Sequence, residues 1–87
     1  MRERPVVTIY SKPGCHLCEE AKEAIMRSGC PVAFRLEIVN IEEDAQLFAR
    51  FKDDIPVIFI NGLKAFKHRV TPREFCDRLC RITQRTR

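Results

Sequence analysis

The chain has 87 residues, of which 45% are hydrophobic and 32% charged, and its formal net charge is +4. This length excludes a second domain, because chains divide only when another core of ~100 residues can form, and the composition excludes a disordered protein. No apolar run approaches the ~20 residues of a membrane helix, and no signal-peptide hydrophobic region begins the chain. We therefore expect one domain over residues 1–87, in a monomeric cytoplasmic protein that does not bind membranes.

The first half of the chain predicts a strand, a helix and a second strand. Residues 5–10 form a short apolar run rich in β-branched residues, which is typical of a strand buried on both faces. From residue 15 to residue 28 the apolar positions recur at helical spacing, and Gly29 is a suitable stop. Apolar and polar residues then alternate over 32–39, as in a strand with one face more deeply buried.

The second half predicts a helix, a hairpin and a final helix. Asn40, with Glu43 in a capping-box position, should begin a helix that ends near residue 53. Residues 57–67 contain an apolar strand, an Asn-Gly turn and a return strand, because this dipeptide favours a type I′ hairpin. The Thr-Pro-Arg-Glu sequence at residues 71–74 combines a cap, a proline at the first helical position and a capping-box glutamate.

The predicted order is β-α-β-α-β-β-α, with no repeat or linker. A β-α-β crossover is almost always right-handed and makes its two strands parallel, whereas the Asn-Gly hairpin makes the last two strands antiparallel. We therefore expect an α/β fold with a mixed four-stranded sheet and helices on both faces. The loop that leaves the first strand then lies at the carboxyl edge of the sheet, where functional residues often gather.

Cys15-His-Leu-Cys18 begins the first predicted helix, at this edge. The unpaired N–H groups and the positive end of the helix dipole favour thiolate, and such surroundings lower a cysteine pKa from ~8.5 to ~3.5–7.5. Cys18 is one turn further along the same face, where its sulfur can reach that of Cys15. This spacing predicts thiol-disulfide exchange, in which Cys15 attacks a substrate disulfide and Cys18 resolves the mixed disulfide. Lys12 and His16 are candidates for tuning the thiolate, since each can add a cation nearby.

The other three cysteines leave a structural alternative to consider. A Cys-x-x-Cys pair is half of a zinc site, and the pair Cys76 and Cys80 could supply the other half. Their apolar neighbours favour an interpretation as core residues of an amphipathic helix, and free cysteine is often buried in this way. We interpret Cys30 as structural too, and we assign no metal site.

The resemblance of the chain to a known family rests on two segments. Thr8-Ile-Tyr-Ser-Lys-Pro-Gly-Cys-His-Leu-Cys18, followed by Ile55-Pro56-Val57 before the Asn-Gly hairpin, resembles glutaredoxin-like members of the thioredoxin superfamily over nearly the whole chain. The resemblance implies a thioredoxin-like fold of the glutaredoxin type, with Cys15 as nucleophile, Cys18 as resolving thiol and Pro56 as a cis-proline. It also implies that the backbone at Ile55 pairs with an extended substrate, and that Lys12 helps to hold glutathione.

Two departures place the chain nearer to the poorly characterised glutaredoxin-like subfamily. His16-Leu17 stands where glutaredoxins have Pro-Tyr in the motif, and residues 68–72 replace a Gly-Gly pair that cradles glutathione. Side chains at residues 68–72 would crowd a close backbone approach. Glutathione thus stays open as a co-substrate, no other cofactor is expected, and the substrate is a disulfide-containing protein or a small thiol.

Two other functions remain as alternatives. Cys15 could ligate an iron-sulfur cluster or another metal ion as a carrier, as some glutaredoxins do. The surplus of positive charge after residue 63, where eight basic residues meet two acidic ones, could instead mark a basic binding module. We favour a solvated basic face and expect no nucleic-acid partner.

Overall fold

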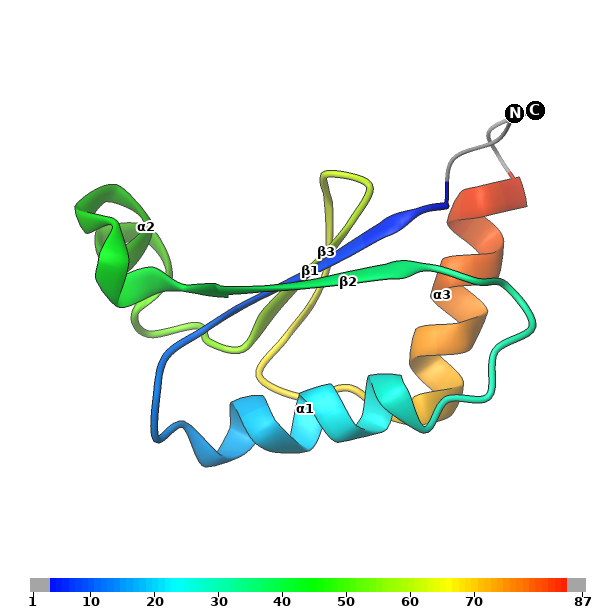
Figure 1. The fold of residues 1–87 in the computed structure, drawn as a ribbon, viewed down its shortest axis with the longest axis horizontal. Helices are drawn as coiled ribbons and strands as arrows, with labels where there is room; N and C mark the ends of the chain where they lie inside the picture. Colours follow the sequence, from blue (N-terminus) through cyan, green and yellow to red (C-terminus); the bar gives the residue numbers. More distant parts are fainter. Residues whose placement is uncertain (1–3, 85–87) are drawn as a thin grey trace.

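A computed structural model describes residues 4–84; the first and last three residues of the expected domain lie outside the described part. One sheet has the strand order β2-β1-β3-β4, where β1 and β2 are parallel and β3 is antiparallel to both of its neighbours (Figure 1). The strands are β1 (Val6–Ser11), β2 (Arg35–Asn40), β3 (Val57–Ile60) and β4 (Leu63–Lys67). The α-helices are α1 (His16–Met26), α2 (Ala45–Phe51) and α3 (Pro72–Gln84). The predicted element order and the mixed sheet are confirmed.

The two faces of the sheet carry different helices. Val7 and Ile9 of β1 and Ile58 and Ile60 of β3 belong to the core cluster that also holds buried residues of α1 and α3. The alternate residues Tyr10, Val57 and Phe59 belong to a second cluster with Phe51 of α2, because successive strand residues point to opposite faces. Helices therefore pack on both faces, with α1 and α3 against the first cluster and α2 against the second.

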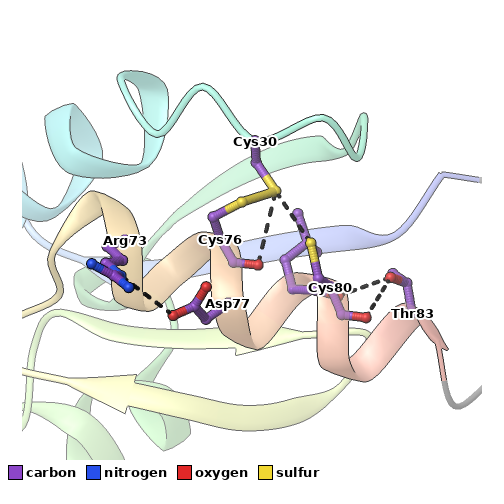
Figure 2. Close-up of a disulfide and its surroundings, with 7 residues drawn as sticks. Cys30, Arg73, Cys76, Asp77, Cys80 and Thr83 are labelled. Atoms are coloured by element: carbon purple, nitrogen blue, oxygen red, sulfur yellow. Dashed lines mark hydrogen bonds and ion pairs between the residues drawn. A yellow bond between two sulfur atoms is a disulfide. The ribbon is translucent and has the colours of Figure 1, made fainter.

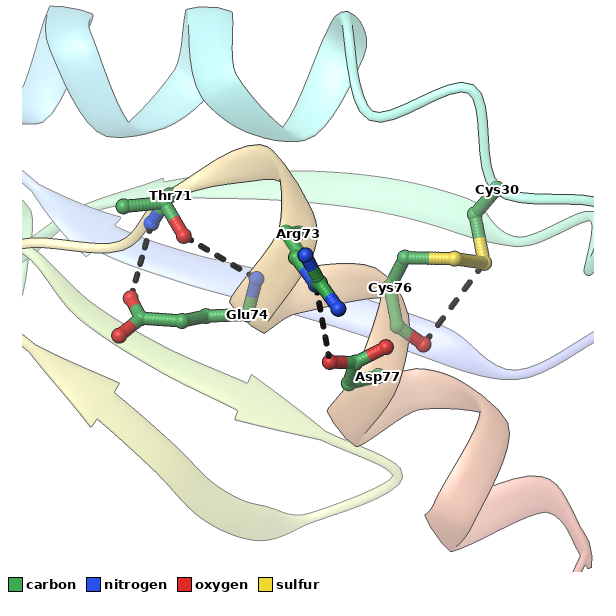
Figure 3. Close-up of polar contacts among 6 residues, drawn as sticks. All are labelled: Cys30, Thr71, Arg73, Glu74, Cys76 and Asp77. Carbon is green, nitrogen blue, oxygen red and sulfur yellow. Dashed lines mark hydrogen bonds and ion pairs between the residues drawn. A yellow bond between two sulfur atoms is a disulfide. The ribbon is translucent and has the colours of Figure 1, made fainter.

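The last helix begins as predicted. The N–H of Glu74 donates to the Thr71 hydroxyl and the N–H of Thr71 donates to the Glu74 carboxylate, each at 3.1 Å, which is a complete capping box (Figure 3). Phe75 and Leu79 of this helix are fully buried against the sheet. The start of α3 is therefore fixed by both its cap and its packing.

The prediction for the second helix was wrong at its start. Asn40 caps only a short 3₁₀ turn at Ile41–Glu43, where its side chain accepts the N–H of Glu42 at 2.9 Å. Asp44 caps α2 instead, and accepts the N–H groups of Gln46 and Leu47 at 2.9 and 3.2 Å. Two cap-forming residues four positions apart divide this segment into two short helices.

The second strand is shorter than the alternation of residues 32–39 predicts. The strand begins at Arg35, where β1 starts to pair with it, so Val32 and Phe34 pack on the core from the preceding loop. Ile38 is 48% exposed, because β2 is an edge strand. The turn after β3 is as predicted, since Asn61 and Gly62 have φ angles of 51° and 81°.

Candidate redox site

The Cys-x-x-Cys motif lies where β1 passes into α1. Cys15 is the N-cap of α1, and its backbone N–H donates to the Lys12 carbonyl at 3.3 Å. Its sulfur accepts the N–H of Cys18 at 3.2 Å, in the position that a hydroxyl or carboxylate oxygen usually takes at an N-cap. One of the unpaired N–H groups of the helix is thereby directed at the Cys15 sulfur, which favours negative charge on that atom.

Cys15 and Cys18 form a disulfide, with their Cα atoms 5.2 Å apart. The two side chains differ in access to solvent, because Cys18 is only 4% exposed whereas Cys15 is half-buried. An incoming disulfide can thus approach Cys15 more easily than Cys18. This asymmetry is the one that the order of attack in a dithiol exchange requires.

The residues before β3 lie beside this pair. Cys15, Cys18 and Ile55 belong to the same hydrophobic cluster, and Pro56 is fully buried. The Ile55–Pro56 peptide bond is cis, as the resemblance implied. The backbone hydrogen bonds that lie outside helices and strands of residues 4–84 include neither the N–H nor the carbonyl of Ile55.

Lys12 and His16 lie on either side of Cys15 and are both exposed. The Lys12 side chain is exposed, and the contact with Cys15 comes from its backbone carbonyl. His16 is 86% exposed, and its Nε2 lies 2.9 Å from the Glu20 carboxylate one turn along α1. The His16 ring therefore contacts an exposed carboxylate.

A cavity of about 190 Å³ lies next to the motif. Its walls come from one face of α1, from the connection between β4 and α3, and from the first turn of α3. The lining residues are Leu17, Glu20, Ala21, His68, Arg69, Val70, Thr71 and Glu74. His68 has a φ of 71°, and its N–H donates to the carbonyl of Pro56 at 2.8 Å. The His68 side chain is exposed, but its backbone joins the end of the hairpin to the cis-proline.

The remaining three cysteines are not core residues, contrary to the sequence-based interpretation of Cys76 and Cys80. Both are only partly buried, because the buried positions of α3 are Phe75, Leu79 and Ile82. Cys76 forms a disulfide with Cys30, with 5.3 Å between the Cα atoms, and the Cys80 sulfur lies 3.8 Å from that of Cys30 (Figure 2). The structure therefore groups Cys76 and Cys80 with Cys30 and not with the Cys-x-x-Cys pair.

Comparisons with known proteins agree with this geometry. Residues 6–79 match the family model of the glutaredoxin-like domain (DUF836). The chain is 37% identical over 70 residues to the glutaredoxin-like protein YDR286C homolog of Dictyostelium discoideum, and the match covers 74% of this chain and 65% of that relative, which is longer.

Two solved structures are also similar to the chain. Target protein XcR50 from X. campestris has a TM-score of 0.75 at 24% identity, with 86% of this chain and 96% of that chain covered. Protein Ne2328 from Nitrosomonas europaea has a TM-score of 0.62 at 26% identity, with 80% and 85% covered. The fold is thioredoxin-like, and the chain belongs to the glutaredoxin-like family.

Proposed function

We propose that the protein is a thiol-disulfide oxidoreductase whose dithiol is Cys15 and Cys18. The observation that carries the proposal is the pair's arrangement: the half-buried Cys15 sulfur receives an N–H at the start of α1, and the buried Cys18 lies within bonding reach. A sulfur at a helix N-terminus loses its proton more easily than an ordinary thiol. Family membership supports a redox role for the same motif.

In the proposed reaction the Cys15 thiolate attacks one sulfur of a substrate disulfide and the other substrate sulfur leaves as a thiolate. Cys18 then loses its proton and attacks the Cys15 sulfur, which releases the second substrate thiol and leaves the Cys15–Cys18 disulfide. Two electrons have passed from the protein to the substrate, and a second dithiol returns them. The protein is reset when that dithiol reduces the bridge.

We further propose that the substrate is a protein disulfide or a low-molecular-weight disulfide that lies along Ile55 and Pro56. The backbone hydrogen bonds outside helices and strands of residues 4–84 use neither the N–H nor the carbonyl of Ile55, which lies beside Cys15, and an extended segment can pair with such groups through main-chain hydrogen bonds. Lys12 supports the turn that holds Cys15 and adds a positive charge to the approach of an acidic substrate.

Single-cysteine variants test the proposal with a fluorescent peptide disulfide as substrate and dithiothreitol as electron donor. Cys15→Ser should reduce turnover to the uncatalysed rate. In a single-turnover reaction of the prereduced chain without dithiothreitol, Cys18→Ser should keep the first attack and accumulate a mixed disulfide at Cys15, which intact-mass measurement detects. Met26→Ser, an exposed position on the same helix, is the matched control and should leave turnover unchanged. Turnover by Cys15→Ser at the unmodified rate would refute the assignment.

The redox potential of the pair, measured in both glutathione and dithiothreitol buffers, tests the use of glutathione. If glutathione is a substrate, the two buffers should give the same potential, and a mixed disulfide with Cys15 should form as an intermediate. No specific observation favours the alternative of an iron-sulfur carrier, since the nearest described thiol to Cys15 is its own disulfide partner.

A further inference from the structure

We propose that Cys30, Cys76 and Cys80, in their reduced state, form a binding site for a thiophilic metal ion such as Zn²⁺. This three-cysteine cluster is separate from the Cys-x-x-Cys motif, so the proposal stands or falls independently of the redox function. Its three sulfurs all lie within 4.8 Å of one another. Figure 2 shows that two of the sulfurs come from α3 and the third from the connection between α1 and β2.

The spacing of the sulfurs fits zinc-thiolate geometry. A Zn–S bond is ~2.3 Å long, so two sulfurs on one tetrahedral ion are ~3.8 Å apart, and ~4.0 Å apart if the ion is trigonal. The sulfurs of Cys30 and Cys80 are separated by 3.8 Å. Once the Cys30–Cys76 bond is broken, a small side-chain rotation of Cys76 brings its sulfur to the same spacing.

The three residues are attached to parts of the backbone that are held by contacts other than the disulfide. Cys76 and Cys80 are one turn apart on α3 and project from the same side of the helix. This helix is fixed against the sheet by Phe75 and Leu79, which are fully buried. Cys30 follows the end of α1 and its side chain packs on the same core cluster. Little reorganisation is therefore needed for binding.

The composition of the cluster determines which ion it would bind. Three thiolates are soft ligands, which select Zn²⁺ or Cu⁺ over Mg²⁺ and Ca²⁺. Among residues 4–84, no histidine or carboxylate joins the three sulfurs as a fourth ligand. The fourth position on a tetrahedral zinc ion would then belong to water or to an external thiol.

The disulfide and the metal site are two states of the same cluster. A dithiol reductant gives two electrons and two protons to the Cys30–Cys76 bond, which becomes two thiols while the reductant becomes a disulfide. Zn²⁺ then forms three bonds to sulfur, three thiol protons pass to solvent, and no oxidation state changes. Oxidation of Cys30 and Cys76 by a disulfide removes two of the ligands and releases the ion.

The test uses the Cys15→Ser/Cys18→Ser chain, in which the three-cysteine cluster provides every remaining thiol. The protein is reduced with a phosphine, freed of reductant under anaerobic conditions and titrated with Zn²⁺ against a chromophoric chelator. We expect one Zn²⁺ per chain, and we expect Co²⁺ at the same site to give thiolate charge-transfer absorption. Protein whose Cys30–Cys76 bond is intact should bind neither ion. Failure to bind zinc after reduction, or equal binding by the oxidised protein, would overturn the proposal.

Two variants in α3 test whether the sulfurs, and not a nearby carboxylate, bind the zinc ion. Cys80→Ser should weaken zinc binding at least about tenfold, whereas Asp77→Ala, which removes an exposed carboxylate beside Cys76, should leave it unchanged. Equal weakening by the two variants would show that the sulfurs do not form the site. The alkylation rate of Cys80 can be measured in the chain that keeps all three cysteines of the cluster, so no substitution in the cluster affects folding. Bound Zn²⁺ should slow this alkylation at least about tenfold. An unchanged alkylation rate would also overturn the proposal.

Discussion

The Cys30–Cys76 disulfide should stabilise the fold much more than the Cys15–Cys18 disulfide. The two bridges have similar Cα separations but span very different lengths of chain, with sequence separations of 46 and 3. The loop-entropy relation gives ~4 kcal/mol for the longer loop and ~1.6 kcal/mol for the shorter one at 25 °C. Loss of the longer bridge should therefore lower the free energy of unfolding by about 2 kcal/mol more than loss of the shorter bridge.

Urea unfolding of Cys30→Ser and Cys18→Ser measures this difference. Cys30 is the residue to replace, because replacing Cys76 would leave Cys30 free to bond with Cys80, whose sulfur is 3.8 Å away. Each variant is compared with the unmodified protein after oxidation, and again in a phosphine reductant with EDTA. The reduced series has no bridges and isolates the cost of the serine itself, including that of burying a hydroxyl at Cys18.

The result that would refute this reasoning is an equal loss of stability in the two variants after subtraction of the reduced series. Such a result would mean that the longer bridge does not restrict the unfolded chain more than the shorter one. A stability of Cys18→Ser, which keeps the Cys30–Cys76 bridge, that does not depend on the redox state of the sample would also contradict it.

Three further predictions concern the fold. Thr71→Ala removes the hydroxyl that caps α3 and should cost ~1 kcal/mol in thermal unfolding; no change would mean that the cap does not stabilise the helix. Phe75→Ala should cost ~3–5 kcal/mol because the ring is fully buried, whereas the control Met26→Ala, at a side chain that is 64% exposed, should stay within ~0.5 kcal/mol, and similar losses would contradict the assignment of the core. Gly62→Ala should cost ~1–2 kcal/mol because its φ of 81° disfavours a side chain, and an unchanged urea midpoint would disprove this account of the turn.

The sequence predicted the features that depend on neighbouring residues. Three such features are the Cys-x-x-Cys motif at a helix start, the Asn61-Gly62 turn and the cap of α3. The residues that form each feature are within a few positions of one another in the sequence, so local chemistry determines it. The start of α2 was missed for a local reason as well, because Asn40 and Asp44 can both cap a helix, and the sequence does not show which one the longer helix uses.

The features that the sequence did not predict depend on packing between distant segments. Cys30 and Cys76 come together because α3 packs beside the end of α1, and no local pattern links residues 46 positions apart. The exposure of Ile38 likewise follows from the place of β2 at the sheet edge. The backbone bond from His68 to Pro56 joins the two ends of the hairpin segment, twelve positions apart in the sequence. Spacing of apolar residues carries no information about these contacts.

The two disulfides lie at opposite ends of α1. The Cys15–Cys18 pair is at the first turn of the helix, and Cys30 of the Cys30–Cys76 pair is just beyond the last turn. Eleven helical residues extend ~16 Å, far more than the contact that sulfur exchange requires. Two pairs on one molecule therefore cannot equilibrate by direct attack, and electrons must move between them through a collision of two molecules or through a diffusing thiol. Equilibration in purified protein should consequently follow second-order kinetics, and dilution should let each pair keep its own oxidation state.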